Sequence, residues 1–170
     1  IVLPVNAAIS YYESQALAWE QAAFIRSRAS AGDRALGQHF LGAIQPFIWR
    51  RSLDFRQLKE IGAMSDRIRD HFSQGQALGP GYDLKRGRGG IREIEFFAQV
   101  HQLIYGGREP ALRAPATVDA LAALASAGRI DSDVGVRLAD HYTLLRRIEH
   151  RLQMVEDQQT HSLPVQTAAL

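Results

Sequence analysis

The residues best suited to chemistry lie in a short basic loop rich in glycine. The loop reads Asp-Leu-Lys-Arg-Gly-Arg-Gly-Gly, and the apolar pattern after it predicts a helix that begins at about Ile91. Free backbone N–H groups at the start of a helix attract anions, and nearby cations add to this attraction. The pattern therefore predicts a site for phosphate, a nucleotide or a docking domain. Its candidate residues are Lys85, Arg88, Gly89, Gly90 and Arg92.

The helix predicted after this loop carries a polar stripe on an otherwise apolar surface. At about 100° per residue, four polar side chains fall on one side of its axis. They are Arg92, Glu95, Gln99 and Gln102. A helix that is apolar nearly all round is buried, so the stripe must face a cleft, a partner domain or an internal ion-pair network. Glu93 lies on the apolar side, where a buried carboxylate would need an arginine partner. The arginines available are Arg108, Arg113, Arg146 and Arg147.

A second polar group is expected on the last helix of the chain. It consists of Arg146, Glu149, His150, Gln153 and Asp157. Their spacing of three and four residues is typical of a solvated helix face. The alternative is that this group seals against the first stripe, through either Glu95 with Arg146 or Arg92 with Glu149. The polar network predicted to support the loop is Glu93, Glu95, Gln99, Arg146 and Glu149.

Apolar residues recur at helical spacing along the chain, and no segment is a convincing strand. We expect an all-α fold, a helical bundle of about six helices, two of them long. The expected helices run from Asn6 to near Ser30, from Asp33 to near Phe47, from Asp54 to near His71, from Ile91 to Tyr105, from Thr117 to Ala127 and from Ser132 to about Glu156. Pro46 predicts a bend or break near the end of the second. Residues 74–81 are expected to form a loop, and Trp19 and Trp49 to anchor the core.

Length and composition indicate one compact helical domain over residues 1–170. The 20 Lys and Arg residues nearly balance the 18 Asp and Glu residues, which disfavours nucleic-acid binding, as do Glu93 and Glu95 beside the short basic cluster. No apolar run approaches the roughly 18 residues of a membrane span, so we expect no membrane partner and a cytoplasmic location. The histidines lack the spacing of a structural metal site. The absence of an initial methionine indicates a piece of a longer protein.

Several separated motifs carry a family resemblance. The run Lys-Arg-Gly-Arg-Gly-Gly-Ile-Arg-Glu-Ile-Glu-Phe is followed by Gly-Gly-Arg at residues 106–108 and Leu-Arg at 112–113. Further matching segments are Tyr-Tyr-Glu at 11–13, Trp-Glu-Gln-Ala-Ala at 19–23, Pro-Phe-Ile-Trp-Arg-Arg at 46–51 and the stretch 142–164. In this order they resemble the bifunctional glutamine synthetase adenylyltransferase and adenylyl-removing enzymes. Gln21 stands where that family is expected to have an arginine.

The resemblance implies a role for each part of the chain. Residues 1–30 would form a helix that connects from an upstream nucleotidyltransferase domain, and residues 83–113 the basic loop with its buried helix. The Arg-Glu-Ile-Glu-Phe form is similar to the adenylyl-removing half, which removes AMP from glutamine synthetase by phosphorolysis, yields ADP and regulates nitrogen assimilation. The implied cofactors are Mg²⁺ with ATP or ADP and phosphate in the parent enzyme, with none bound by this chain. The implied partners are the upstream domain, glutamine synthetase and the PII signal protein.

The carboxylates that the family's chemistry requires are missing from this sequence. Nucleotidyl transfer in the family uses Gly-Ser and an Asp-x-Asp pair to hold metal ions. The nearest match, Asp131-Ser132-Asp133, lacks the Gly-Ser and is predicted to cap a helix instead. We therefore assign no catalytic residue and no metal ligand, and expect the chain to be inactive alone. Two alternatives remain: a helical domain of a PII uridylyltransferase, which residues 91–96 disfavour, and a non-catalytic regulatory or protein-binding module.

Overall fold

The computed structural model describes residues 3–51, 59–60, 62–63, 78–155 and 159–165. Over these ranges the chain is helical without a named β-strand, which confirms the all-α prediction. The elements are α1 (Val5–Ser14), α2 (Ala18–Phe24), α3 (Arg34–Ala43), α4 (Gln45–Ile48), α6 (Ile91–Tyr105), a 3-10 turn (Pro110–Leu112), α7 (Thr117–Ser126) and α8 (Ser132–Met154). Of the predicted helix that starts at Asp54, residues 59–60 and 62–63 are described and are helical, and the rest lies outside the described residues. The first half of the predicted loop 74–81 also lies outside them, and the described half, residues 78–81, has no helix.

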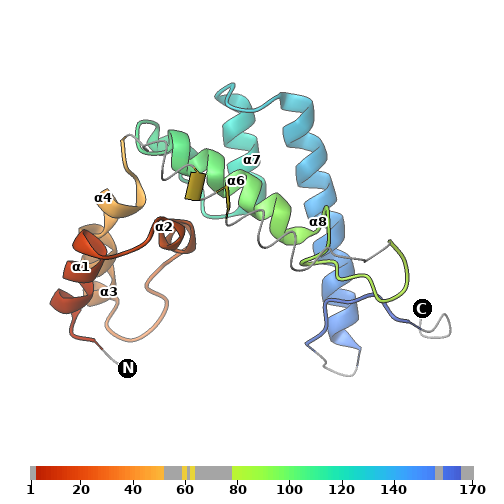
Figure 1. The fold of residues 1–170 in the computed structure, drawn as a ribbon, viewed down its shortest axis with the longest axis horizontal. Coiled ribbons are helices and arrows are strands. Elements are labelled where there is room, and N and C mark those ends of the chain that lie inside the picture. The colour runs from red at the N-terminus through yellow and green to blue at the C-terminus, as the bar shows by residue number, and fades with distance from the viewer. Residues whose placement is uncertain (1–2, 52–58, 61, 64–77, 156–158, 166–170) are drawn as a thin grey trace.

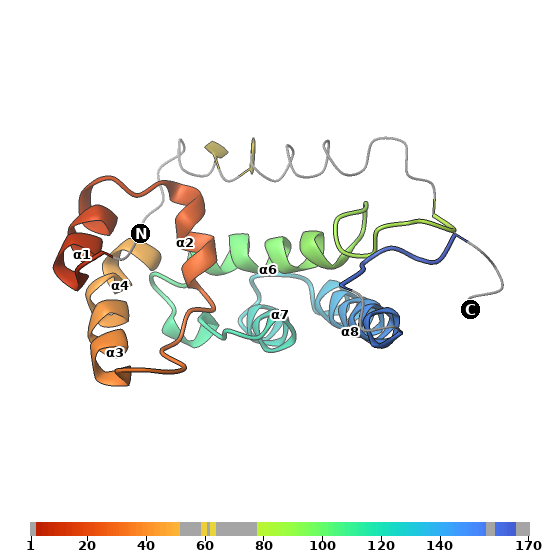
Figure 2. The ribbon, with the colours of Figure 1, turned by 90° about the horizontal axis from the view of Figure 1, so that it is seen from below.

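Helix α6 joins two groups of helices (Figures 1 and 2). Helices α1, α3 and α4 lie toward its carboxyl end, and α2 packs along its side. Helices α7 and α8 form an antiparallel hairpin that packs on another side of α6. Its Leu103 belongs to an amino-terminal cluster of buried side chains with α2 and α4. Its Ile94 and Ala98 belong to a carboxyl-terminal cluster with Leu121 of α7. Because α6 supplies residues to both cores, it holds the two groups in one unit.

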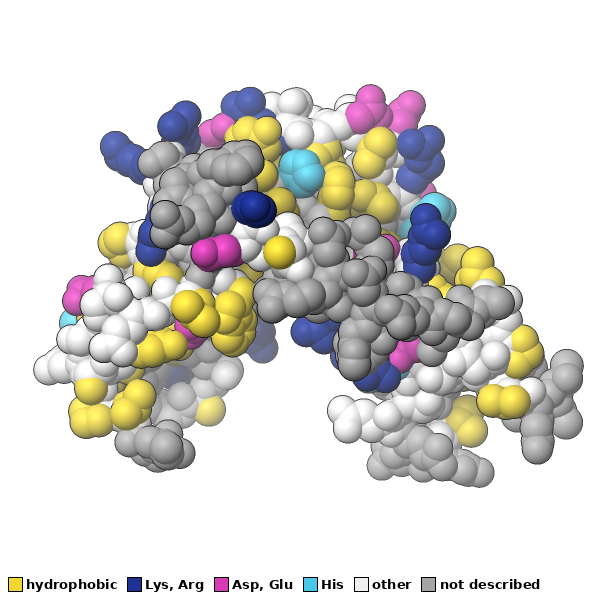
Figure 3. Space-filling view, in the orientation of Figure 1, with side chains coloured by type: hydrophobic (Ala, Val, Ile, Leu, Met, Phe, Trp, Pro, Cys, Tyr) yellow, Lys and Arg dark blue, Asp and Glu magenta, His cyan; other side chains and the backbone are white. Residues whose placement is uncertain are grey.

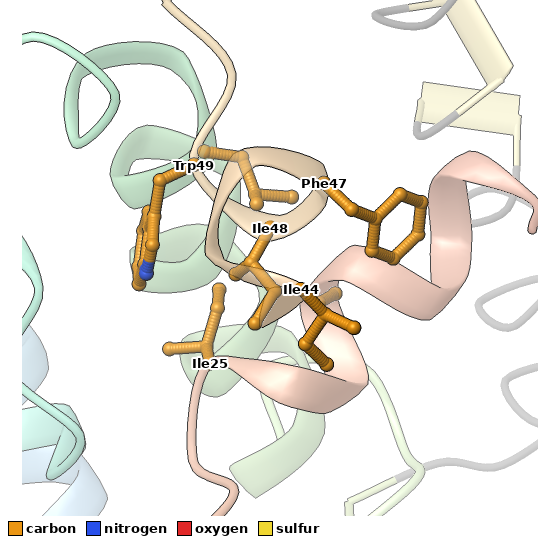
Figure 4. Close-up of a cluster of buried hydrophobic side chains, with 7 residues drawn as sticks. Ile25, Ile44, Phe47, Ile48 and Trp49 are labelled. Atoms are coloured by element: carbon orange, nitrogen blue, oxygen red, sulfur yellow. The ribbon is translucent and has the colours of Figure 1, made fainter. Parts of the chain in front are cut away.

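The amino-terminal cluster explains one correct prediction and one wrong one. Trp49 packs with Ile25, Ile44 and Ile48 (Figure 4) and is 8% exposed, as expected of a core anchor. Trp19 is 48% exposed, so its prediction as a core anchor is wrong. Helix α2 instead buries the side that carries Gln21, Ala22 and Ile25. Trp19, in its first turn, lines an open cavity.

The long helix predicted from Asn6 to Ser30 is two helices with a break at residues 15–17. The Tyr11 carbonyl accepts the N–H groups of both Gln15 and Ala16, which ends α1. The carboxylate of Glu20 accepts the Leu17 N–H at 2.9 Å and the Tyr11 hydroxyl at 2.9 Å. A glutamate at the third helical position that accepts the N–H of the cap residue is a helix-start signal. Glu20 therefore starts α2 in the middle of a continuous apolar pattern.

The first predicted helix also ends earlier than expected, at Phe24 and not near Ser30, whereas the predicted starts of α3 and α8 agree with the structure. Asp33 accepts the Leu36 N–H at 3.0 Å and begins α3. Asp131 accepts the N–H groups of Asp133 and Val134 at 2.9 and 3.1 Å, which confirms that it caps α8. Pro46 lies in the first turn of α4, where a missing N–H costs little, and α3 has already ended at Ala43. The predicted break is therefore present.

The segment after α8 returns to the segment before α6. The Leu84 N–H donates to the His161 carbonyl at 2.8 Å, and the Leu163 N–H donates to the Tyr82 carbonyl at 2.9 Å. An isolated antiparallel bridge pairs Asp83 with Ser162 between these bonds. The basic loop is therefore tied at its start to a distant part of the chain. Of the helices that the structure describes, none combines the length and apolarity that a membrane span requires.

Candidate functional site

Asp83 organises the start of the basic loop. Its Oδ1 accepts the N–H groups of Lys85 and Arg86 at 2.9 and 2.8 Å, and its Oδ2 accepts Arg86 Nε at 2.7 Å. Burial by itself would raise the pKa of Asp83, but the backbone N–H and guanidinium of Arg86 and the N–H of Lys85 outweigh it and lower the pKa. The side chain is therefore an ionised internal cap for the loop.

The glycines give the loop its shape. Gly89 has a φ of +77°, in the left-handed region that glycine adopts without strain. A Cβ on Gly87 would lie 2.5 Å from the Tyr82 ring, and a Cβ on Gly90 would lie 2.7 Å from the Leu84 carbonyl oxygen. The Tyr82 hydroxyl also donates a hydrogen bond to the Arg88 backbone carbonyl. Only this sequence of glycines allows the backbone to pack so closely.

The backbone N–H groups at the start of α6 are occupied, which corrects the expectation that they would be free. The Gly89 N–H donates to Glu93 Oε2 at 2.9 Å. The N–H groups of Gly90, Ile91 and Arg92 donate to backbone carbonyls at 2.9, 2.9 and 3.0 Å. These bonds satisfy the donors that a helix start otherwise leaves open. An anion at this loop would therefore be held by side chains.

Three basic side chains of the loop are available for that purpose. Arg88 and Arg92 are exposed, and Lys85 is half-buried. Within the described part of the chain, none of the three lies within ion-pair distance of a carboxylate. Arg86 differs because it is bound to Asp83. The structure thus separates one structural arginine from three cations that can meet a ligand.

Glu95 is the centre of the supporting network. Its Oε1 accepts hydrogen bonds from Arg26 at 3.1 Å, from Arg146 at 3.0 Å and from the Tyr142 hydroxyl at 3.0 Å. The predicted pairing of Glu95 with Arg146 is therefore confirmed. Arg26 extends the network to the Thr117 hydroxyl. Sequence reasoning did not assign Arg26, because it lies on a different element and no spacing links it to α6.

Glu149 is buried, so the interpretation of its helix face as solvated is wrong for this residue. His150 is exposed, as that interpretation expects, and Asp157 lies outside the described residues. Glu149 is 1% exposed, with Arg146 Nη1 at 2.7 Å from Oε2 and His161 Nδ1 at 2.8 Å from Oε1. The segment that contains His161 folds back on α8 and covers Glu149. Burial alone would lower the pKa of Arg146, but hydrogen bonds with Glu149 and Tyr142 and the charge of Glu95 raise it overall. Arg146 therefore stays charged between two carboxylates.

The polar stripe of α6 meets different surroundings along its length. Gln102 is 2% exposed, and its Nε2 donates to the carbonyls of Leu112 and Ala114 at 2.7 and 2.8 Å. Arg92 and Gln99 line an open cavity of about 220 Å³ between α2 and α6. The alternative pair of Arg92 with Glu149 does not form within the described residues. Of the four stripe residues, Glu95 therefore belongs to the ion-pair network, Arg92 and Gln99 line the cavity, and Gln102 binds the turn that follows α6.

Charged groups on the rest of the surface do not form one basic face. Figure 3 shows Lys and Arg side chains at several separate places, with acidic side chains among them. Among the described residues, no group of three or more His, Asp or Glu side chains could hold a metal ion. The basic loop is thus a local feature of an otherwise mixed surface.

Similar proteins match nearly the whole chain. Bifunctional glutamine synthetase adenylyltransferase/adenylyl-removing enzymes of Caulobacter vibrioides and Agrobacterium fabrum are 51% and 48% identical over 95% and 100% of this chain. The corresponding enzyme of Xanthobacter autotrophicus is 46% identical over 100% of it. The chain belongs to this adenylyltransferase family. It spans 16–17% of the length of these relatives.

Two family models match consecutive parts of this member of the adenylyltransferase family. The model described as glutamate-ammonia ligase adenylyltransferase matches residues 1–43, and the model described as GlnD PII-uridylyltransferase matches residues 61–169. The second match contains α6, α7 and α8. Residues 61–169 therefore resemble the uridylyltransferases as well as the adenylyltransferases. The relatives that match nearly the whole chain are adenylyltransferases.

Proposed function

We propose that this chain is the helical domain that supports the adenylyl-removing half of a glutamine synthetase adenylyltransferase. In that reaction AMP leaves adenylylated glutamine synthetase by phosphorolysis, which forms ADP and regulates nitrogen assimilation. The observation that carries the proposal is the 45–51% identity, over 95–100% of the chain, to enzymes whose names include this activity. The Arg-Glu-Ile-Glu-Phe run at residues 92–96, which is similar to the adenylyl-removing half, supports this choice between the two halves.

The basic loop would lie beside the catalytic cleft of the preceding nucleotidyltransferase domain. Lys85, Arg88 and Arg92 would contact phosphate oxygens or dock that domain, since guanidinium and ammonium groups bind phosphate strongly. Gly89 and Gly90 would act by shaping the loop, because their N–H groups are already used. The hydrogen bonds around Asp83 hold the loop in one conformation before a ligand arrives, which reduces the entropy lost on binding.

The parent enzyme would supply everything that this sequence lacks. Its catalytic domain would bring the paired carboxylates and Mg²⁺ with ATP or ADP and phosphate, so the isolated chain is expected to be inactive. Residues 1–30, which contain α1 and α2, would follow that domain. Glutamine synthetase and the PII signal protein would be the protein partners, in the cytoplasm.

Substitution of the loop cations tests this role. In the full-length protein, Lys85→Ala and Arg88→Ala should each lower the phosphorolysis rate about tenfold or more, because each removes one charge-assisted contact. Helix content measured by circular dichroism should stay unchanged. Arg137→Ala, at an exposed arginine of α8, is the matched control and should retain the rate. Unchanged phosphorolysis in both loop variants would exclude the proposed contact.

A second candidate function is that of a PII uridylyltransferase, favoured by the family model that matches residues 61–169. The two functions differ in substrate. Incubation of the full-length protein with adenylylated glutamine synthetase and phosphate should release ADP under the first proposal. Uridylylation of PII without that release would support the second.

A further inference from the structure

An arginine-lined cavity lies at the opposite end of α6 from the basic loop. It has a volume of about 800 Å³ and is formed by residues around α4 and by the turn after α6. Four of its lining residues are arginines: Arg50, Arg51, Arg108 and Arg113. No acidic side chain lines it in the part of the chain that the structure describes. At 1.5 Å per residue, the 15 residues of α6 separate the two basic regions by roughly 20 Å.

Glycine brings the two sides of this cavity together. A Cβ on Gly107 would lie 1.8 Å from the Arg50 carbonyl oxygen, so only glycine permits the observed approach of the two backbones. Arg108 Nε then donates to the Arg51 carbonyl at 2.8 Å, and Arg113 Nε donates to the Gly106 carbonyl at 2.7 Å. The cavity is therefore part of the folded structure and not a gap between loosely placed segments.

These contacts fix Arg108 and Arg113 but leave the ends of their side chains available. In Arg108 and Arg113 the backbone bond uses Nε, and the described structure gives their Nη groups no hydrogen bond. The Arg113 guanidinium lies 5.2 Å from the centre of the Trp49 ring, which further limits its orientation. None of the four lining arginines forms an ion pair within the described residues.

The acidic residue next to Arg108 in the sequence does not neutralise this charge. Glu109 is next to Arg108 in sequence, yet its carboxylate pairs with Arg129 at 2.6 Å. Like charges gathered around one cavity repel one another, and the repulsion is relieved when an anion binds. One carboxylate would offset a single charge of the four.

We infer that this cavity binds the phosphate chain of an oligophosphate, such as a nucleoside di- or triphosphate. A chain of two or three phosphates carries a charge that approaches that of the four arginines, and its oxygens suit the paired N–H groups of guanidinium. The volume lies within the range of about 300–1,000 Å³ typical of small-molecule sites. The inference does not depend on the proposed function, because it concerns other residues at the other end of α6.

Arginine-specific labelling of the full-length protein tests the site directly. Phenylglyoxal modification is followed peptide by peptide by mass spectrometry, with and without sodium tripolyphosphate at constant ionic strength. Labelling of Arg51 and Arg108 should fall as tripolyphosphate is added, whereas labelling of the exposed Arg137 should not. Loss of labelling at all three, or at none, would overturn the inference. So would an Arg108 that is unreactive before tripolyphosphate is added, since another part of the protein would then cover the cavity.

A charge reversal measures the contribution of the arginines. The Arg51 side chain is exposed and, within the described residues, makes no hydrogen bond or ion pair, so its replacement leaves the backbone contact with Arg108 in place. Arg51→Glu should weaken the tripolyphosphate protection of Arg108 about tenfold or more, while Arg137→Glu should leave it unchanged. Equal protection in both variants would contradict the inference.

Parallel titrations identify which part of a nucleotide is recognised. Orthophosphate, tripolyphosphate and ADP are compared by their protection of Arg108. Stronger protection by tripolyphosphate than by orthophosphate supports recognition of a phosphate chain. Protection by ADP without protection by tripolyphosphate would overturn it, because the base would then carry the binding. The peptides that contain Lys85 and Arg88 report on the basic loop in the same experiment.

Discussion

Glu95 links three helices and the end of a fourth through a single carboxylate oxygen. Arg26 follows α2, Arg146 and Tyr142 belong to α8, and Arg26 also reaches Thr117 of α7. These three donors supply the hydrogen bonds that water would otherwise give to the Glu95 carboxylate, which is largely buried where the helices meet. At the residue scale, this carboxylate does more to fix the position of α6 than any of the exposed loop cations.

Loss of this charge should destabilise the chain. Glu95→Gln leaves Arg26 and Arg146 close together without their shared anion, at an expected cost of about 1–3 kcal/mol. The value is below that of a fully buried pair because the two arginines are 34% and 31% exposed. Urea unfolding gives the measurement, with Asp140→Asn at an exposed α8 position as the control. A Glu95→Gln variant as stable as that control would show that the network is not a stabilising one.

The lowered pKa of Asp83 predicts how the stability of the folded chain changes as the pH falls. The pKa of Asp83 in the folded state is lowered, so its stabilising effect is complete above the unfolded value of about 3.9 and is lost as the pH falls through the folded value. The gap in thermal stability between the natural chain and Asp83→Asn should therefore narrow as the pH falls below about 4. A gap that is constant with pH would mean that the charge of Asp83 does not stabilise the loop.

The sequence identified the residues of the loop but not their bonds. Lys85, Arg88 and Arg92 could be selected because basic residues among glycines before a helix form a recognisable pattern. That Asp83 and Glu93 turn back to occupy the backbone N–H groups depends on side-chain rotamers, which no spacing encodes. His161 could not be assigned to Glu149, because nothing in the sequence shows that the chain folds back over α8.

Among the elements, those with strong end signals were predicted best. Helix α6 begins after Gly90 and ends before Gly106, as expected, and α8 begins after its Asp131 cap. The first predicted helix failed because apolar spacing continues through its break. The break depends on Glu20, a residue that is equally acceptable inside a helix. The hydrogen bonds of Glu20 thus set the boundary between α1 and α2, which the spacing of apolar residues does not show.

The turn after α6 depends on one close backbone contact. Gly107→Ala would place a Cβ 1.8 Å from the Arg50 carbonyl, so α4 or the turn must move, and we expect a loss of about 2 kcal/mol or more. Gly42→Ala is the matched control, because a Cβ there meets nothing within 4 Å and α3 should gain up to about 1 kcal/mol. Urea unfolding of both variants provides the test. Equal effects of the two substitutions would show that the contact at Gly107 is not restrictive.

At the scale of the whole molecule, α6 should make the two clusters unfold together. Ile94→Ala removes a side chain from the carboxyl-terminal cluster and Leu103→Ala one from the amino-terminal cluster, each at about 2–5 kcal/mol. Hydrogen exchange should show each substitution weakening the protection of both α4 and α7. Loosening confined to the substituted side would mean that the two clusters are independent units.

The tie between the segments around Tyr82 and Leu163 sets an order of events during synthesis. A ribosome releases Lys85 and Arg88 well before His161 and Leu163, whose backbone groups fasten the start of their loop. Helices α6 and α7 consist of local contacts and can form while the chain is still growing. The basic loop is therefore completed last, so a nascent chain halted within α8 would carry its cations on an unfastened segment.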